Sequence, residues 1–472
     1  MPVLSARVAS LGAVCFVLVH TGLAHGQTLA VTGGTVIDGT GRAPIADAVV
    51  VMQNGRITAV GSAKDVAIPS GATRIDARGK YLIPGLMDSN LHLYLNINLE
   101  ELIRYEDRYD QIALEGAQIA LKTGQTTVFD TWGPRAALIK VRDQINAGQA
   151  QGSRIFLAGN IIGFSGPLGP DFIEAAAAHV SKASAKKINE TWEQGTGRNL
   201  LWMTPDSVRA AIRTYTGLGV DFLKFGGSGH QEMNLLMFSP RAEQAIVEEG
   251  HRAGKTVQAH VTSPESIDMA IDAGVDILTH GDISGPAIPI PPETIKKIVD
   301  RGVSISVLSL TKRAIEAQSK IPGPNLLLPY MKVAATNIRN LANAGAKLMV
   351  STDAGVEDPI RLAESPTLAA DTVDARTKLG EGHFNALTAF EEAGMAPMEI
   401  LKSITINIAR AYKVDKDLGT LEAGKAADLV ILDANPLEAA KNYRRINSVI
   451  KDGKVVNIAS LPTAPIISAK TK

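Results

Sequence analysis

"VQAHVTSPESIDMAIDAGVDILTHGD", residues 257–282, holds two short apolar runs on either side of an amphipathic segment. The runs VQAH and DILTH have the length of buried strands, and each ends in a histidine. Between them, SPESIDMAIDAG repeats apolar residues at helical spacing and ends in glycine, as surface helices commonly do. The stretch therefore predicts a strand–helix–strand unit with His260 and His280 at equivalent strand ends.

The same unit recurs through the middle of the chain. Eight β-rich runs, most of them followed by an amphipathic segment, lie between residues 81 and 414. This repetition fits a (β/α)8 barrel of the α/β class. A doubly wound parallel sheet is the alternative, but it does not explain why ionisable residues gather at the strand ends. The eight runs begin at Tyr81, Thr126, Arg154, Asp221, Thr256, Asp276, Val303 and Lys347.

The two ends of the chain have a different pattern. Residues 27–80 and 415–465 contain short apolar runs broken by Gly, Asn-Gly and Asp-Gly turns, which is typical of short strands. Neither end has enough strands for a stable sheet alone. We therefore expect both ends to pair into one small β-sandwich domain that brackets the barrel of residues 81–414.

Composition excludes several classes of function. Lys plus Arg and Asp plus Glu are both 48, so the chain lacks the basic surplus that nucleic acid or anionic lipid would require. Aromatic residues make up only 4%, which argues against a base-stacking surface. We expect a small-molecule substrate, no nucleic acid, no membrane span and, as is common for this kind of barrel, a homo-oligomer.

Residues 1–26 have the pattern of a secretory signal peptide. Arg7 precedes the apolar run LGAVCFVLV, and small residues at Ala24 and Gly26 suggest cleavage after Gly26. A membrane anchor is the alternative, but the run is shorter than the roughly 20 residues that a span needs. The only cysteine, Cys15, lies in this segment. The sequence thus predicts a bacterial periplasmic or secreted protein without disulfides or thiolate ligands.

Five ionisable residues lie inside or at the ends of the predicted barrel strands: His92, Lys224, His260, His280 and Asp353. Each alone has a structural explanation, such as a hydrogen-bonded histidine or a lysine that reaches a carboxylate. Their recurrence at equivalent strand ends is better explained by a shared site, because buried charges must be paired or bound to a metal. Imidazole and carboxylate ligands suit Zn, Co, Mn or Fe.

Several motifs resemble those of the amidohydrolase superfamily, especially the group of imidazolonepropionases and metal-dependent prolidases. They are IPGLMDSNLHL, FLKFGGSG, VSTDAG and LGTLEAGKAADLVILDANPLE. The resemblance implies one or two divalent metal ions, zinc first among them, and a carboxylated Lys224 that bridges them. It also implies that His92, His260, His280 and Asp353 are metal ligands, with Asp353 and His280 in catalytic roles.

Asn90 departs from that pattern, because the superfamily usually has histidine at this position. The Asn-x-His phrase resembles the subgroup of phenylurea and molinate hydrolases. An amide oxygen is a weaker ligand than imidazole, so the first-strand metal would be weak or absent. Alternatively, Asn90 hydrogen-bonds a neighbour or a water molecule and never touches metal.

The expected reaction is hydrolysis of a C–N bond in an amide, urea or carbamate by a metal-activated water molecule. Asp353 would take the proton from water and return it to the leaving nitrogen. A dipeptidase of the prolidase type is the alternative enzyme. It would need a cation for the substrate carboxylate, for which Arg198, Lys312 and Arg313 are weak candidates. A binding protein that lost catalysis is the alternative from another class.

Substrate choice is expected to lie in the long connections. The one after the third strand, residues 164–203, carries Phe164 and Trp192, and Tyr330 follows the seventh strand. Long connections of this kind are usually lids or binding loops. With His230 from the loop after the fourth strand, these side chains suggest a roomy apolar pocket for an N-acyl or aryl amide. The aromatic residues have a second explanation, which is that they only pin the loops down.

Overall fold

A computed structural model describes residues 28–94, 99–321, 323, 325, 328–355 and 373–461. The predicted signal segment, residues 1–26, and positions 462–465 of the predicted β-sandwich domain lie outside these ranges. In the part of the chain that is described, none of the helices has both the length and the apolar character needed to cross a membrane.

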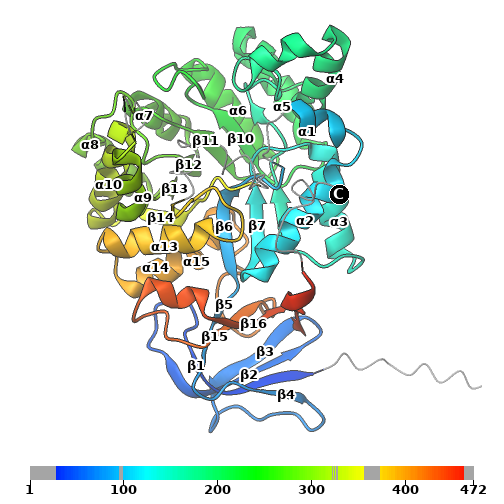
Figure 1. Ribbon diagram of the computed structural model, residues 1–472, viewed down its shortest axis with the longest axis vertical. Coiled ribbons are helices and arrows are strands. Elements are labelled where there is room, and N and C mark those ends of the chain that lie inside the picture. The colour runs from blue at the N-terminus through cyan, green and yellow to red at the C-terminus, as the bar shows by residue number, and fades with distance from the viewer. Residues whose placement is uncertain are drawn as a thin grey trace, which may run out of the picture.

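The predicted barrel strands are all present, in parallel and in chain order. Main-chain hydrogen bonds join the ends of the first and last strands, from Asp353 N to Asn90 O at 2.9 Å and from His92 N to Ala354 O at 2.8 Å. The fold is therefore a (β/α)8-type barrel, which confirms the expectation (Figure 1). The strands are β6 (Leu86–Leu91), β7 (Gln125–Asp130), β8 (Arg154–Leu157) with β9 (Ile161–Ile162), β10 (Leu223–Gly226), β11 (Val257–His260), β12 (Ile277–Thr279), β13 (Ser304–Val307) and β14 (Lys347–Val350).

Helices cover the outside of the strands, and local sequence fixes where several of them start and stop. Ser263 caps the helix that opens at Pro264, and Gly274 ends it with a φ of 91°, a backbone angle that glycine adopts without strain. The helices are α1 (Leu99–Arg104), α2 (Tyr109–Lys122), α3 (Arg135–Asn146), α4 (Lys182–Glu193), α5 (Pro205–Thr216), α6 (Pro240–Arg252), α7 (Pro264–Ala273), α8 (Pro292–Arg301), α9 (Lys312–Ser319), α10 (Leu328–Asn343), α13 (Gly382–Glu392), α14 (Pro397–Ser403) and α15 (Ile406–Ala411), with short 3-10 helices η1 (Glu174–His179), η2 (Arg198–Trp202), η3 (Ala440–Arg444) and η4 (Ile458–Ser460).

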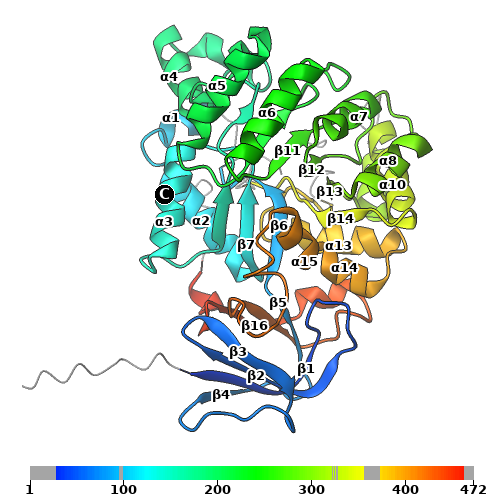
Figure 2. The same ribbon diagram turned by 180° about the vertical axis from the view of Figure 1, so that it is seen from behind.

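Strands from both ends of the chain form one bent sheet below the barrel, as Figures 1 and 2 show. Register shifts around Gly34 in its first strand interrupt the regular pairing. Side chains from both ends, among them Val31, Val50, Leu429 and Ile450, meet in one apolar core. The strands are β1 (Leu29–Val36), β2 (Ile45–Gln53), β3 (Arg56–Ser62), β4 (Thr73–Asp76), β5 (Tyr81–Pro84), β15 (Leu429–Leu432), β16 (Ile446–Lys451) and β17 (Lys454–Val455).

The boundary between the two parts lies later than the sequence suggested. The run that begins at Tyr81 was expected to be one barrel strand, but β5 pairs with β1 and with β15 in the bent sheet. Only from Leu86 does the chain pair with β7 of the barrel. Pro84 has no N–H to donate to a ladder, so the change of sheet falls at Pro84 and Gly85.

Arg154 fastens the bent sheet to the barrel. It is the first residue of β8, and its guanidinium forms ion pairs with Asp428 and Asp452 of the bent sheet. It also donates to Thr127 Oγ1 of β7 at 3.1 Å. Asp428 is buried and otherwise accepts only from Asp452 N within the described residues, so Arg154 supplies the positive charge that a buried carboxylate needs.

Candidate active site

The six predicted site residues come together at the carboxyl ends of the barrel strands. Asn90 lies near the end of β6, and His92 follows that strand directly. The remaining four lie on or after β10, β11, β12 and β14: Lys224, His260, His280 and Asp353. All except the half-buried Asp353 are buried.

Asp353 is the centre of the group. Its Oδ1 lies 3.0 Å from His92 Nε2, accepts from Asn90 Nδ2 at 3.0 Å and lies 3.8 Å from His280 Nε2. Burial alone would raise the pKa of Asp353, but His280, His92 and Lys224 hold that pKa well below its usual value. The carboxylate is therefore ionised and faces the imidazole nitrogens. Asp353 and His280 also share a left-handed backbone, with φ of 56° and 64°, which is strained for residues with a Cβ and is found at functional sites.

His92 has an acceptor at both ring nitrogens. Its Nδ1 lies 3.2 Å from Trp132 O, and its Nε2 faces Asp353. A neutral imidazole has only one N–H, and burial lowers the pKa of His92, which disfavours the doubly protonated ring. If Nδ1–H is donated to the carbonyl of Trp132, the Nε2 lone pair is turned toward the carboxylate. That is the tautomer a metal-binding histidine needs, and two facing lone pairs call for a cation.

Lys224 has no carboxylate within hydrogen-bonding distance among the residues that the structure describes. Its Nζ donates to Asn90 Oδ1 and to Thr131 Oγ1, each at 3.1 Å. Burial lowers the pKa of Lys224 to about 8, against the attraction of Asp353 and Asp130. The lysine does not reach a surface carboxylate, and the neutral amine that carboxylation requires is accessible near neutral pH.

His260 and His280 lie side by side, with ring centroids 4.8 Å apart. Within the described ranges, both nitrogens of His260 and Nδ1 of His280 lack a hydrogen-bond partner, although they are buried. Burial lowers the pKa of both imidazoles, that of His280 to about 3, so both rings are neutral at pH 7. Neutral buried imidazoles without partners have free lone pairs, which is the state that a metal ligand requires.

The nitrogen and oxygen atoms of these side chains are suitable ligands for a divalent cation, but they are not already arranged around one point. In the described chain, His, Cys, Asp and Glu side chains do not form a cluster of three or more with the arrangement of a metal site. The residue that would complete the set is Lys224, which as a carbamate supplies an anionic oxygen in place of a cation. A ligand set built from these residues would therefore need a modified Lys224.

Asn90 uses its whole hydrogen-bonding capacity. The amide nitrogen donates to Ser351 Oγ at 3.0 Å and to Asp353, and the oxygen accepts from Lys224 Nζ and from Thr131 Oγ1. An amide has two donor hydrogens and two acceptor lone pairs. With Lys224 as the amine, Asn90 is a bridge between strands with no lone pair to offer a metal.

His230 and Phe164 lie next to His260. Their rings are 5.9 Å and 5.3 Å from that of His260, and His230 Nδ1 donates to Asp171 O of the long connection at 2.8 Å. A Cβ at Gly226 would lie 2.3 Å from Phe164 Cε1, so only glycine lets this ring lie against β10. The long connection and the loop after β10 therefore meet beside His260.

Trp192 and Tyr330 do not line the pocket in the way that was expected. Trp192 is fully buried, and its ring packs against Tyr94 and Tyr109 at 5.7 Å and 5.2 Å. It pins the long connection down. Tyr330 lies at the start of α10, and in the described chain it has no ring contact or hydrogen bond with the other predicted site residues.

Sequence reasoning missed two residues near the site. Asp130 ends β7, and one of its carboxylate oxygens has no partner among the described residues. Burial raises the pKa of Asp130 to about 8; its place at a strand end was the signal that could have found it. Arg376 is half-buried. Burial lowers the pKa of His280 and raises that of Asp282 to about 6, and the charge of Arg376 acts on both groups in the lowering direction. Arg376 lies in a loop whose sequence has no strand or helix pattern that could have pointed to it.

Two of the three weak cation candidates for a substrate carboxylate, Arg198 and Arg313, are already paired. Arg198 forms an ion pair with the buried Asp171 at 2.8 Å, and Arg313 forms one with Asp374. Lys312 opens α9, and its main-chain N–H bonds to Glu392. Arg376 is the cation that the structure offers instead.

Comparison with known proteins agrees with this geometry. Residues 81–456 match the model of the amidohydrolase family, and the chain belongs to that family. The structure of a molinate hydrolase is 35% identical over 95% of this chain and 98% of its own, with a TM-score of 0.89. Phenylurea hydrolase B is 34% identical over 94% and 100%, with a TM-score of 0.88. Ochratoxinase of Aspergillus niger is 26% identical over 89% of this chain and 85% of its own. The predicted resemblances are thereby confirmed.

Proposed function

We propose that this protein is a metal-dependent hydrolase that cleaves a C–N bond in an amide, urea or carbamate. The observation that carries the proposal is the convergence of His92, His260, His280 and Lys224 on Asp353 at one end of the barrel. A binding module needs neither an ionised buried carboxylate nor a lysine without a counter-ion. The alternative of a binding protein that has lost catalysis is therefore the weaker one.

When bound, one or two divalent ions would supply a Lewis acid that polarises the substrate carbonyl and makes a water molecule more acidic. His260 and His280 each have at least one nitrogen without a hydrogen-bond partner within the described residues, and they would hold one ion together with a carboxylated Lys224. His92 and Asp353 are the further donors. Zinc suits this ligand chemistry best, with cobalt, manganese or iron as alternatives.

The residues of the chain would then do the following. Asp353 Oδ1 accepts the proton of the attacking water and returns it to the leaving nitrogen. Asn90 holds the carboxylate of Asp353 in place through its amide N–H. His280 Nε2 lies 3.8 Å from the same oxygen, which places this histidine next to the proton carrier. Burial of the group excludes bulk water and strengthens each of these contacts.

The aromatic side chains beside His260 support an aromatic or otherwise apolar substrate. Phe164 and Phe172 approach the ring of His230 at 6.1 Å and 5.0 Å, and Phe172 stacks on Trp132 at 4.1 Å. An aryl or N-acyl group would find aromatic faces there. The hydrolases of molinate and phenylurea that the chain resembles are named for substrates of this general kind.

A dipeptidase remains the second candidate because of Arg376. The charge of Arg376 acts on both His280 and Asp282, and a guanidinium binds carboxylates in a bidentate manner. Turnover of an aryl amide and of an X-proline dipeptide by the unmodified protein and by Arg376→Gln distinguishes the two. If the dipeptide is the substrate, the variant loses kcat/KM for it alone; if the neutral aryl amide is the substrate, the variant changes little.

We further propose export from the cytoplasm, on the basis of the N-terminal pattern of a charged residue, an apolar run and a small-residue cleavage site. N-terminal sequencing of the protein isolated from a periplasmic extract tests this. A mature chain that begins at Gln27 is the expected result, and an uncleaved chain in the cytoplasmic fraction would contradict it.

The experiment that tests the proposed reaction is a substrate panel on metal-loaded protein. It compares an N-acyl amide, an aryl urea and a thiocarbamate with a carboxylic ester of similar shape. We expect turnover of at least one C–N substrate that is lost on chelation and regained with zinc. Absence of turnover on every C–N substrate with metal bound would refute the proposal.

A further inference from the structure

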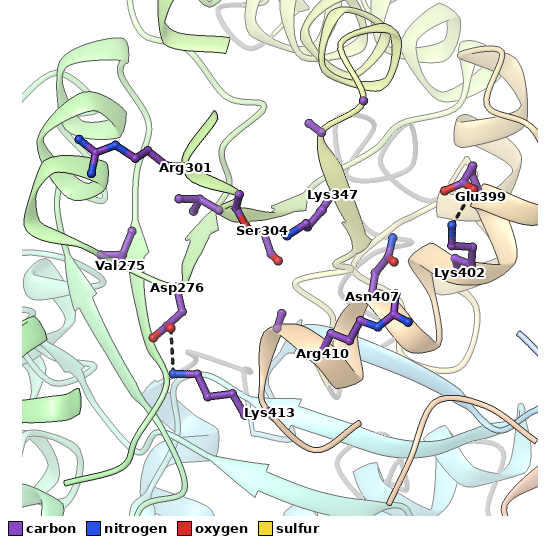
Figure 3. A pocket seen from close by; sticks show the side chains of 15 residues that line it. Val275, Asp276, Arg301, Ser304, Lys347, Glu399, Lys402, Asn407, Arg410 and Lys413 are labelled. Atoms are coloured by element: carbon purple, nitrogen blue, oxygen red, sulfur yellow. Dashed lines mark hydrogen bonds and ion pairs between the residues drawn. The ribbon is translucent and has the colours of Figure 1, made fainter. Parts of the chain in front are cut away.

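A cavity of about 480 Å³ lies at the end of the barrel opposite to the active site. Ser304 and Lys347, which line it, are the first residues of β13 and β14, whereas the active-site residues follow the carboxyl ends of the strands. Arg301 ends α8, and Arg410 lies in the last turn of α15. Figure 3 shows Lys347 and Ser304 on one side of the cavity, with Arg410 and Lys413 on the other.

The acidic residues of the cavity wall are already neutralised. Asp276 accepts from Lys413 Nζ at 2.9 Å, from His251 Nε2 at 2.8 Å and from Val257 N at 2.8 Å. Glu399 pairs with Lys402 at 2.8 Å. Neither carboxylate is left to balance the other cations that line the cavity.

Three cations are therefore uncompensated: Arg301, Lys347 and Arg410. Lys347 Nζ donates to a main-chain carbonyl, Gly302 O, at 3.1 Å. The guanidinium groups of Arg301 and Arg410 have no hydrogen bond or ion pair within the described residues, and both side chains are exposed. A concave surface lined by charges of one sign focuses its field on the space it encloses.

We propose that this cavity binds a small molecule that carries two or more phosphate or carboxylate groups. Guanidinium groups match such oxyanions with paired N–H donors, and three separate cations can neutralise more than one of them. A concavity of this volume favours a small molecule over the flat face of an acidic protein. The site is independent of the proposed hydrolysis, because its lining residues share none of the active-site side chains.

Isothermal titration calorimetry at fixed ionic strength tests the proposal with two probes. Fructose 1,6-bisphosphate presents phosphates, propane-1,2,3-tricarboxylate presents carboxylates, and fructose is the neutral control. We expect one probe or both to bind once per chain with a Kd below about 1 mM. The probe that binds more tightly identifies the preferred oxyanion.

Lys347→Gln/Arg410→Gln should weaken that binding at least tenfold. The matched control is Lys186→Gln/Lys454→Gln, which removes the same charge at exposed positions outside the cavity and should bind as the unmodified chain does. Arg301→Gln, at the end of a helix, serves as a second variant if the double variant is unstable. The proposal is overturned if the unmodified chain binds neither probe, or if the matched control loses as much affinity as the cavity variant.

Discussion

Asn90 Nδ2 donates a hydrogen bond to Asp353 Oδ1 over 3.0 Å, which joins the first strand of the barrel to the loop after the last strand. The oxygen of the same amide accepts from Lys224 Nζ. One neutral side chain thus connects the proposed proton carrier with the proposed carbamate. Neutral histidine cannot make all four hydrogen bonds of Asn90, because it has only one donor and one acceptor.

Asn90→His should therefore raise the number of tightly bound metal ions without raising kcat. The new imidazole restores a first-strand ligand, but it releases Asp353 from its amide donor. To check this prediction, the metal content of the variant is measured after gel filtration, together with its kcat on the best C–N substrate. A variant with the metal content of the unmodified chain and a higher kcat would contradict a bridging role for Asn90.

Asp353→Asn should keep the fold and most of the metal but lose about 10²- to 10⁴-fold in kcat, the usual contribution of a general acid–base group. The amide is close in size to the carboxylate, but it cannot take a proton from water. Thermal melting and metal analysis show whether the variant is intact. Near-normal turnover would place the proton carrier elsewhere, with His230 the first residue to examine.

Arg154→Met should destabilise the contact between the bent sheet and the barrel by up to about 3–5 kcal/mol at pH 7, because it leaves Asp428 buried and unpaired. Burial would raise the pKa of Asp452, but Arg154 and Lys451 lower it below the usual 3.8. A lowered carboxyl pKa adds stability above the unfolded value and loses it as pH falls through the folded one. Urea melts of both forms should converge below about pH 4; a gap unchanged at pH 3 would argue against the ionic contact.

Much of the fold was accessible from the sequence because it depends on local patterns. Strand runs and amphipathic segments alternate along the chain, and the histidines of VQAH and DILTH mark the strand ends. The change of sheet at Pro84 and Gly85 was missed because β5 and β6 are separated by a single residue and were expected to form one strand. Only the long-range pairing of β5 with β15 separates them.

The sequence predicted those site residues whose location follows from their place at the end of a barrel strand. Asp130 also lies at a strand end, so the sequence could have predicted it as a site residue. Arg376 lies in a loop, and no sequence pattern predicts where a loop residue lies in space. The side chain of Trp192 was compatible with a pocket or with loop packing, and its neighbours Tyr94 and Tyr109 decide for packing. Those neighbours come from distant parts of the chain, so no local pattern could have shown the contact.

Lys224→Ala should lose bound metal and activity together, since Lys224 is the donor that completes the ligand set. Lys224→Ala with added short carboxylic acids, such as acetate or propionate, should regain part of both, because a free carboxylate can occupy the place of the carbamate. Mass spectrometry under non-denaturing conditions should show the added CO₂ on the unmodified chain. Full metal occupancy in the alanine variant would show that a carbamate on Lys224 is not a metal ligand.

The central claim, a hydrolase that depends on a metal held by His260, His280 and a modified Lys224, is tested most directly by metal titration. Apo-protein is titrated with zinc in the presence of bicarbonate, and hydrolysis of the best C–N substrate is measured at each metal-to-protein ratio. We expect no activity without metal and nearly full activity at about one equivalent of zinc. Asn90 replaces one imidazole of the first-strand pair, so a second ion would be bound only weakly. Full activity in the metal-free protein would contradict the account, and a plateau only at two equivalents would show that Asn90 serves a two-metal site.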